Sequence, residues 1–295
     1  MANDDAIGHT RHGLYDVPMG FDESIQRAAD LIGDADGLLV AAGAGMGVDS
    51  GLPDFRGPEG FWKAYPALGQ RGLKFYEVAS PRTFETDPAL AWGFYGHRLD
   101  LYRRTRPHTG FDLLRAWGDR AIQGCGVFTS NVDGHFQRAG FGASPIAECH
   151  GSIHHLQCSV PCGTAIWPAD EFEPQVDAET CMLVNEPPRC PWCGALARPN
   201  ILMFGDGAWQ DARSRGQETY LRSWLDSVQR LVVVELGAGT AIPSVRHFSH
   251  SLVANHGARL VRINPREPVV PTLRDVPIPG PALATIRAID EILSR

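Results

Sequence analysis

The sequence lacks an apolar run long enough to span a membrane. Its longest apolar stretches, such as Leu231–Leu236, have the length of a strand, whereas a spanning helix needs roughly 20 residues. The N-terminal residues MANDDAIGHTRHG also lack the apolar core of a secretion signal. We therefore expect a cytoplasmic protein with no membrane partner.

Positive charge is also scarce. The 34 acidic residues outnumber the 27 lysines and arginines, which leaves a formal net charge of −7. This balance does not favour nucleic acid or an anionic membrane as the main partner. With 43% hydrophobic and 21% charged residues, the 295-residue chain is typical of a globular protein. It is long enough for one large domain or two modest ones.

Cysteines are odd in number, which argues against a disulfide framework. Four of the seven cluster within 36 residues, as Cys158-x3-Cys162 and Cys190-x2-Cys193. Four thiolates in two such pairs describe a structural zinc site with no open coordination position. A redox role for the second pair is the alternative, and the presence of the first pair makes it the less favoured one.

Strands and helices alternate along most of the chain. Strands are predicted at 37–42, 126–129, 146–149, 201–204, 231–236 and 259–264. Helices are predicted at 24–32, 88–104, 110–117, near 137, 217–228, 242–255 and 281–293. Residues 154–198 hold the clustered cysteines and show no long periodic element. We therefore predict an α/β fold with a doubly wound parallel sheet, interrupted by residues 154–198 as an inserted small module.

A glycine-rich turn follows the first predicted strand. Gly43-Ala44-Gly45-Met-Gly47 would let the backbone approach a pyrophosphate, whose charge the N–H groups of the turn would meet. A plain tight turn is equally compatible with this sequence. The acidic residue expected about 20 residues later is not evident, so the pattern is not an ordinary dehydrogenase fingerprint. Residues 49–62 continue the loop with glycines, aromatics and charges that suit a lid over a ligand or a mobile surface loop.

Polar side chains also follow the ends of two further predicted strands. Asn131 and Asp133 come after the strand at 126–129, and an amide and a carboxylate there suit a carboxamide and a ribose. An Asn/Asp turn is the alternative interpretation. His150 comes after the strand at 146–149, where a neutral imidazole can act as a general base or fill a structural role.

Taken together, these segments resemble the sirtuin family, the NAD-dependent protein deacylases. Each motif alone is weak, but the set follows the family order from about residue 22 to 293, which makes it specific. The motifs are Gly43-Ala-Gly45, Ser50-Gly-Leu-Pro-Asp54-Phe-Arg56-Gly, Asn131-Val-Asp133, His150-Gly, the two cysteine pairs, Arg198-Pro-Asn-Ile-Leu-Met-Phe204-Gly, Gly237-Ala-Gly239 and Ile263-Asn264.

The resemblance implies how the chain is divided. A Rossmann-type NAD-binding domain would comprise residues 21–56, 108–153 and 199–295. Residues 57–107 would form a cofactor loop and helical insertion, and residues 154–198 a zinc-binding module. Residues 1–20 would be an N-terminal tail.

The resemblance also implies a reaction and its residues. NAD would be the co-substrate, one structural zinc would be bound per chain, and acylated lysine side chains of proteins would be the partners. The acyl oxygen would attack the ribose carbon as nicotinamide leaves, and His150, with Asn131 as the second catalytic residue, would take a proton from the ribose hydroxyl system. Phe204 and Gly205 would contact the substrate. The cofactor-binding residues would be Gly43, Ala44, Gly45, Asp54, Phe55, Arg56, Ser130, Asn131, Asp133, Gly237, Gly239 and Asn264.

A tyrosine and an arginine suggest which acyl group is removed. Tyr95 and Arg98 are three residues apart in a predicted helix and so project from one face. In the sirtuins that prefer acidic acyl groups, a Tyr-x-x-Arg pair at this place binds the distal carboxylate. The alternative is that Arg98 pairs with Asp100 or a loop carboxylate and that Tyr95 packs in the core.

The chain departs from the family pattern at several positions. Ser130 replaces a glutamine, Asp206 replaces a glutamate, and Trp209 falls where proline is usual. His135-Phe136 stands in place of Leu-His, and the turn at Gly237 lacks its usual Thr-Ser. These departures leave NAD binding expected and bear on acyl-peptide affinity.

Two further functions compete with deacylation. An NAD hydrolase or ADP-ribosyltransferase would share the first step and differ only in the acceptor. A non-catalytic NAD or ADP-ribose binding module would need no general base, so the retention of His150 argues against it.

Overall fold

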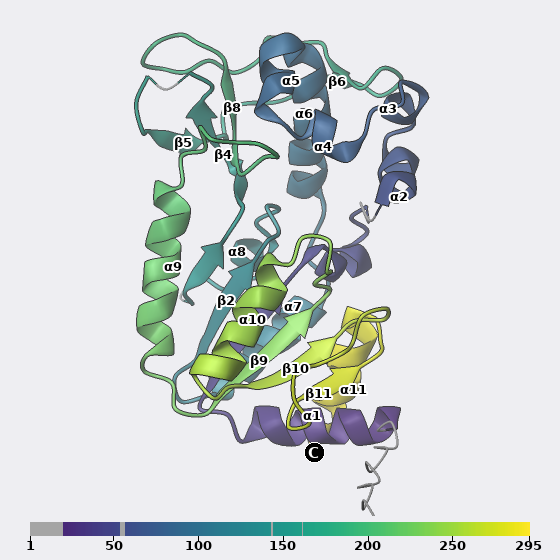
Figure 1. Cartoon of the computed structure of the whole chain (residues 1–295), viewed down its shortest axis with the longest axis vertical. Coiled ribbons are helices and arrows are strands. Elements are labelled where there is room, and N and C mark those ends of the chain that lie inside the picture. The colour runs from purple at the N-terminus through teal and green to yellow at the C-terminus, as the bar shows by residue number, and fades with distance from the viewer. Residues whose placement is uncertain (1–19, 54–56, 143, 161) are drawn as a thin grey trace, which may run out of the picture.

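The computed structural model describes residues 20–53, 57–142, 144–160 and 162–295, which form two parts (Figure 1). The larger part is built on a sheet of six parallel strands in the order β11-β10-β9-β1-β2-β3. Its strands are β1 (Gly37–Ala42), β2 (Cys125–Thr129), β3 (Ile146–Glu148), β9 (Leu231–Leu236), β10 (Arg259–Ile263) and β11 (Val276–Ile278). The predicted α/β fold with a doubly wound parallel sheet is confirmed.

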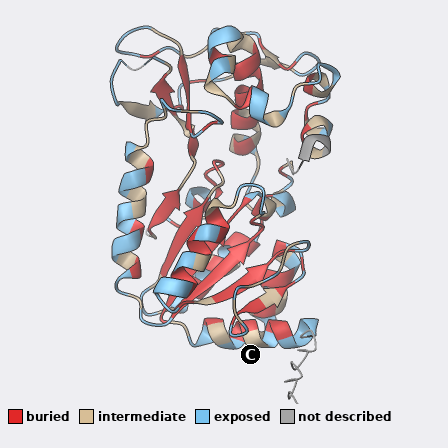
Figure 2. Cartoon of the chain, viewed as in Figure 1, coloured by how far each residue is buried: buried red, intermediate tan, exposed pale blue. Residues whose placement is uncertain are grey.

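Helices cover both faces of this sheet, which is why its central strands β1 and β9 are almost wholly apolar. In β1, Leu38 and Val40 face one side and Leu39 and Ala41 face the other, following the two-residue period of a strand. The first face is covered by α1 (Phe21–Gly33), α7 (Gly110–Arg120), α8 (His135–Arg138) and α11 (Ala282–Leu293). The second face is covered by α9 (Ala212–Leu225) and α10 (Ser244–Asn255). The buried strands and the exposed outer faces of the helices are visible in Figure 2.

The smaller part has its own sheet and its own core. An antiparallel sheet in the order β5-β4-β8 packs with helices from an earlier segment of the chain (Figure 1), and Phe61, Phe94, Ile153 and Ile201 share its core. The helices are α2 (Gly57–Ala64), α3 (Pro66–Gln70), α4 (Phe75–Val78), α5 (Pro81–Thr86) and α6 (Pro88–Arg104). The strands are β4 (Gly151–Cys158), β5 (Ile166–Pro168) and β8 (Ala197–Ile201), with a hairpin of β6 (Val176–Asp177) and β7 (Met182–Leu183).

The prediction of a strand at 201–204 is wrong. The strand there is β8, which ends at Ile201 and runs antiparallel to β4 in the second sheet instead of joining the parallel one. The eight-residue strand β4 lies partly in the segment that showed no periodic element. The predicted module limits at 154 and 198 fall inside β4 and β8, so the division of the chain into domains stays a prediction.

The described residues include no helix that is both long and apolar enough to cross a bilayer.

Candidate functional site

The large sheet has a topological switch point between β1 and β9. From β1 the chain moves outward through β2 to β3 and later returns to β9 on the other side of β1. Open α/β sheets bind ligands at the carboxyl ends of the strands flanking such a point. Both predicted glycine turns lie there, since Gly43–Gly45 follows β1 and Gly237–Gly239 follows β9.

The two glycine turns pack against each other through their backbones. A Cβ atom on Gly43 would lie 2.7 Å from the Cα of Ala238, and one on Gly237 would lie 2.5 Å from the Cα of Gly45. Gly237 also has a φ of 59°, and its carbonyl accepts a hydrogen bond of 3.1 Å from the N–H of Gly45. Only glycine fits at Gly43 and Gly237, because a side chain at either position would separate the two turns.

The end of β2 is joined to the end of β1. The Nδ2 of Asn131 donates to the carbonyl of Gly43 at 3.1 Å, and the N–H of Ser130 donates to the carbonyl of Ala42 at 3.1 Å. Asp133 is buried, and its Oδ1 accepts from the N–H of His135 at 2.9 Å. Three of the predicted site residues therefore follow β2, and two of them, Ser130 and Asn131, bond to the backbone at the first glycine turn.

His150 follows the next strand, β3, and contacts a residue that sequence reasoning missed. Its Nε2 lies 3.1 Å from the Oγ of Ser244, the first residue of α10. Burial lowers the pKa of His150, and a hydrogen bond to the backbone of Ser130 raises it by a smaller amount. The imidazole is therefore neutral near pH 7, the form that accepts a proton. A serine directly after Pro243, at the start of a predicted helix, was the only sequence signal for this contact.

Asn264 supports the second glycine turn from the end of β10. Its side chain is buried and its Nδ2 donates to the carbonyl of Ala238 at 2.9 Å. Its Oδ1 accepts from the N–H groups of Arg266 and Glu267. The Glu267 carboxylate in turn accepts from the hydroxyl of Thr240 at 2.6 Å, so the loops after β9 and β10 form one connected edge. The remaining predicted cofactor residues Asp54, Phe55 and Arg56 lie outside the described residues.

Phe204 and Gly205 lie in the loop after β8, between the two parts. The ring of Phe204 is 42% exposed and meets the ring of Phe75 edge-on at 5.6 Å. Its N–H donates to the carbonyl of Ala79 at 3.0 Å. Gly205 has a φ of 69°, a left-handed conformation that favours glycine.

Tyr95 and Arg98 are both buried on α6, inside the smaller part. The guanidinium of Arg98 donates two hydrogen bonds to the hydroxyl of Tyr102, at 3.0 and 2.8 Å, and lies over the rings of Phe94 and Tyr102 at 5.3 Å. Burial raises the pKa of Tyr95 to about 12, so its hydroxyl keeps its proton. Asp100, the alternative partner considered for Arg98, instead pairs with Arg104 at 2.5 Å.

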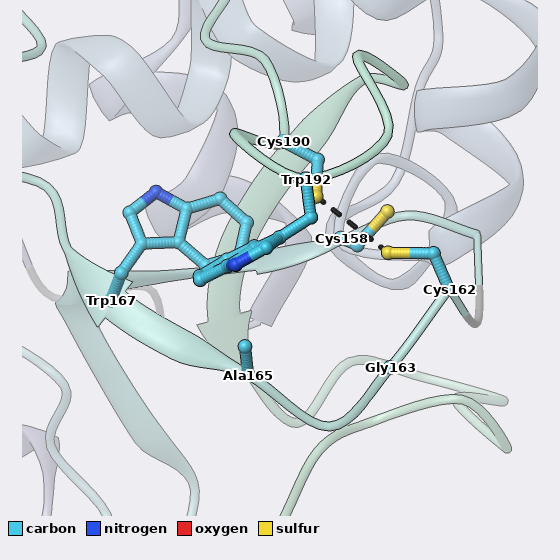
Figure 3. Close-up of a pocket in the computed structure, with 7 residues that line it drawn as sticks. All are labelled: Cys158, Cys162, Gly163, Ala165, Trp167, Cys190 and Trp192. Atoms are coloured by element: carbon cyan, nitrogen blue, oxygen red, sulfur yellow. Dashed lines mark hydrogen bonds between the residues drawn. The ribbon is translucent and has the colours of Figure 1, made fainter.

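The four clustered cysteines converge on one point. Their sulfurs all lie within 4.8 Å of one another, with Cys158 and Cys193 at 3.6 Å and Cys162 and Cys190 at 3.6 Å. Figure 3 shows three of the four, Cys158, Cys162 and Cys190, with their sulfurs close together. A tetrahedral zinc with Zn–S bonds of about 2.3 Å places its sulfurs roughly 3.8 Å apart. A disulfide would need about 2.05 Å. The donor set and its spacing therefore fit zinc, and no disulfide occurs among the described cysteines.

Comparison with known proteins gives consistent matches. The model of the Sir2 family matches residues 43–226. The chain is 33% identical to NAD-dependent protein deacylase 2 of Pyrobaculum aerophilum, over 90% of this chain and 95% of that protein. It is 32% identical to the NAD-dependent protein deacylase of Methylococcus capsulatus, over 79% of this chain and 83% of that protein.

Solved structures with a similar fold agree with this family match. One, described as the structural basis for the mechanism and regulation of Sir2 enzymes, has a TM-score of 0.66 and 25% identity, covering 93% of this chain and 99% of that chain. A Sir2 homologue in complex with NAD has a TM-score of 0.65 and 21% identity, covering 91% of this chain and 94% of that chain.

Proposed function

The chain belongs to the Sir2 family, and from this premise we propose that it removes acyl groups from lysine side chains of proteins by transferring them to the ADP-ribose of NAD, with release of nicotinamide. It is an NAD-dependent protein deacylase, as its relatives of about 30% identity over most of the chain are. The observation that carries the proposal is the convergence of His150, Asn131 and the two glycine turns at one edge of the parallel sheet.

NAD binding is supported by the backbone geometry of this edge. The turn Gly43–Gly45 would meet the pyrophosphate, and Ser130, Asn131 and Asp133 would hold the nicotinamide side. The second turn, with Gly239 and Asn264, would meet the adenosine half. Four of the similar solved structures are described as complexes with NAD or ADP-ribose.

The chemistry needs a proton acceptor close to the ribose. When acyl oxygen has attacked the ribose carbon, the Nε2 of neutral His150 would take a proton from the ribose hydroxyl, which would replace Ser244 as its partner, and the hydrogen bond to the backbone of Ser130 would orient the imidazole. Asn131 would orient the nicotinamide side through an amide already fixed by the carbonyl of Gly43. The zinc at Cys158, Cys162, Cys190 and Cys193 would be structural, since all four positions of the tetrahedron are taken by sulfur.

Proteins carrying acylated lysine are the proposed partners. One similar solved structure is described with a deacetylated p53 peptide, which is a property of that protein. The net charge of −7 supports the expectation that nucleic acid and membranes are not partners, and a cytoplasmic location stays a prediction.

Product analysis tests the proposed function. Mass spectrometry of a reaction containing NAD and a panel of acyl-lysine peptides is expected to find deacylated peptide, nicotinamide and O-acyl-ADP-ribose in equal amounts. Nicotinamide released at the same rate without peptide would instead identify an NAD hydrolase. ADP-ribose attached to protein would identify a transferase, and NAD binding without any product would identify a binding module.

The preference for an acyl group is proposed to depend on Tyr95 and Arg98. A guanidinium can donate two charge-assisted hydrogen bonds to the distal carboxylate of a succinyl or glutaryl group, and the phenol can add a third. We expect succinyl-, malonyl- or glutaryl-lysine peptides to be processed faster than acetyl-lysine, and Arg98→Met to reverse the order. Losing a charged hydrogen-bond pair costs about 1.5–3 kcal/mol, or about 10- to 100-fold in relative kcat/KM.

A matched control lies on the same helix. Arg104 is largely exposed and pairs with Asp100 on the outer side of the helix's last turns, so Arg104→Met should leave the ratio of succinyl to acetyl activity unchanged. Equal activity of the wild type on both peptides, with no response to Arg98→Met, would contradict the acyl-pocket assignment and leave deacylation itself standing.

A further inference from the structure

A buried ion pair holds together the loop that carries Phe204 and Gly205. We define the substrate loop as residues 202–208, which follow β8. Asp206 accepts two hydrogen bonds from Arg198 of β8, each 2.8 Å long, and the two side chains are only 0% and 1% exposed. The same carboxylate accepts from the N–H groups of Met203 and Ala208 at 3.3 and 3.2 Å. One carboxylate therefore binds the strand before the loop and both ends of the loop itself.

The substrate loop is also tied to the catalytic histidine. The N–H of Leu202 donates to the carbonyl of His150 at 3.0 Å, and the N–H of Phe204 donates to the carbonyl of Ala79 at 3.0 Å. At its far end, the carbonyl of Ala208 accepts from the side chain of the fully buried Gln157 at 3.0 Å. The loop is thus attached to His150 on one side and to the smaller part on the other.

Arg198 is close enough to the proposed acyl pocket to act on it electrostatically. The positive charge of Arg198 and the negative charge of Asp206 both act on the pKa of Tyr95, which lies on α6. α6 is itself joined to β8, because the indole N–H of Trp92 donates to the carbonyl of Ala197 at 2.9 Å. The ion pair therefore joins the substrate loop to β8, the strand to which α6 is hydrogen-bonded.

We propose that the Arg198–Asp206 ion pair positions the substrate loop, so that the exposed ring of Phe204 is held at a fixed distance from His150 when the acyl-lysine chain enters. The inference rests on the proposed function. The pair acts through the loop and does not itself touch the reacting atoms, so both residues are positioning residues. Loss of one partner leaves a buried charge without its counter-charge, and the loop then loses the acceptor that joins its two ends.

The experiment compares four variants in steady-state assays with NAD and an acyl-lysine peptide. Asp206→Asn keeps the shape and removes the charge, and Arg198→Lys keeps the charge and removes the bidentate fork. Both are expected to raise the KM for peptide about 10- to 100-fold, equivalent to about 1.4–2.7 kcal/mol of lost peptide binding, because the loop that contacts the peptide is no longer held in place. The KM for NAD should change less than about twofold. Asp206→Glu restores a carboxylate and should return the peptide KM to within about threefold of the wild type.

A second buried ion pair provides the matched control. Glu235 of β9 accepts two hydrogen bonds from Arg262 of β10, at 2.6 and 3.0 Å. The side chains of Glu235 and Arg262 are 0% and 1% exposed, as buried as those of Asp206 and Arg198. It lies in the large sheet, away from the substrate loop. Glu235→Gln should lower the melting temperature as Asp206→Asn does, without raising the peptide KM.

Three results would overturn the inference. The first is a peptide KM that rises equally in Glu235→Gln, because the effect would then be general destabilisation. The second is a peptide KM that stays at the wild-type value in folded Arg198→Lys, and the third is the absence of rescue by Asp206→Glu. A wild-type enzyme that deacylates no peptide would overturn the proposed function instead, so the two failures are distinguishable.

Discussion

Replacing His150 with alanine is expected to lower the deacylation rate by about 10²- to 10⁴-fold, the contribution typical of a general base. The imidazole, kept neutral by burial and held by its hydrogen bond to the backbone of Ser130, is the proton acceptor we assign at the carboxyl edge of the sheet. Affinity for NAD should be largely unchanged, because the glycine turns and Asn131 are held by backbone contacts that do not involve the imidazole. Single-turnover rates and NAD titration of the same preparation measure both quantities.

A histidine elsewhere on the same framework serves as the control. His247 is exposed on α10, three residues after Ser244, and His247→Ala should deacylate at the wild-type rate. If His150→Ala also keeps the wild-type rate, another group takes the proton and our assignment of the base is wrong. If it loses affinity for NAD in parallel with activity, the residue is part of the binding site rather than the base.

Replacing Cys190 with alanine should remove the zinc and unfold the module around it. Structural zinc contributes apparent binding free energies of about 10–16 kcal/mol in small zinc-binding peptides, which is folding free energy wherever no site exists in the unfolded chain. Cys190 is a buried member of the cluster, and its loss leaves three thiolates for a four-coordinate ion. We expect zinc content near zero and a markedly lower melting temperature, or insoluble protein.

A cysteine outside the cluster separates the loss of zinc from the general effect of replacing a buried cysteine. Cys125 is buried beside Ser144, and Cys125→Ser should keep one zinc per chain. Cys162→Ala, from the other pair, should reproduce the loss seen in Cys190→Ala. Well-folded wild-type protein without zinc, measured by metal analysis, would contradict the structural role of the cluster.

The large sheet could be predicted from the sequence because the apolar pattern of its strands is recognisable within each short segment. The predicted bounds 37–42 and 231–236 coincide with β1 and β9, two mostly apolar strands that are each followed by a glycine. Such strands are buried on both faces, so their composition alone distinguishes them from the surrounding chain. The short helices α3, α4 and α5 escaped prediction because four to six residues are too few to establish a helical period.

Strand β8 shows why part of the site could not be predicted. Its sequence places Arg198 and Asn200 at fully buried positions, which a local pattern would assign to the surface. The guanidinium of Arg198 donates to Asp206 and the Nδ2 of Asn200 donates to Gln157, and those contacts exist only after the smaller part has folded. The same is true of Ser244, which meets His150 from 94 residues away. The order of the motifs located the catalytic edge of the sheet, whereas the contacts that orient the side chains there depend on tertiary structure.

The position of β9 beside β1 has a consequence for the order in which the chain folds. These two central strands pair residue by residue, yet Gly37 and its partner Leu231 are roughly 190 residues apart along the chain. During synthesis one edge of β1 therefore stays unpaired until the whole smaller part has been made. An apolar strand with an open edge is a site of aggregation, and pairing across such a distance is slow. We expect refolding yield to depend steeply on protein concentration and to improve when the smaller part folds first, with zinc supplied from the start.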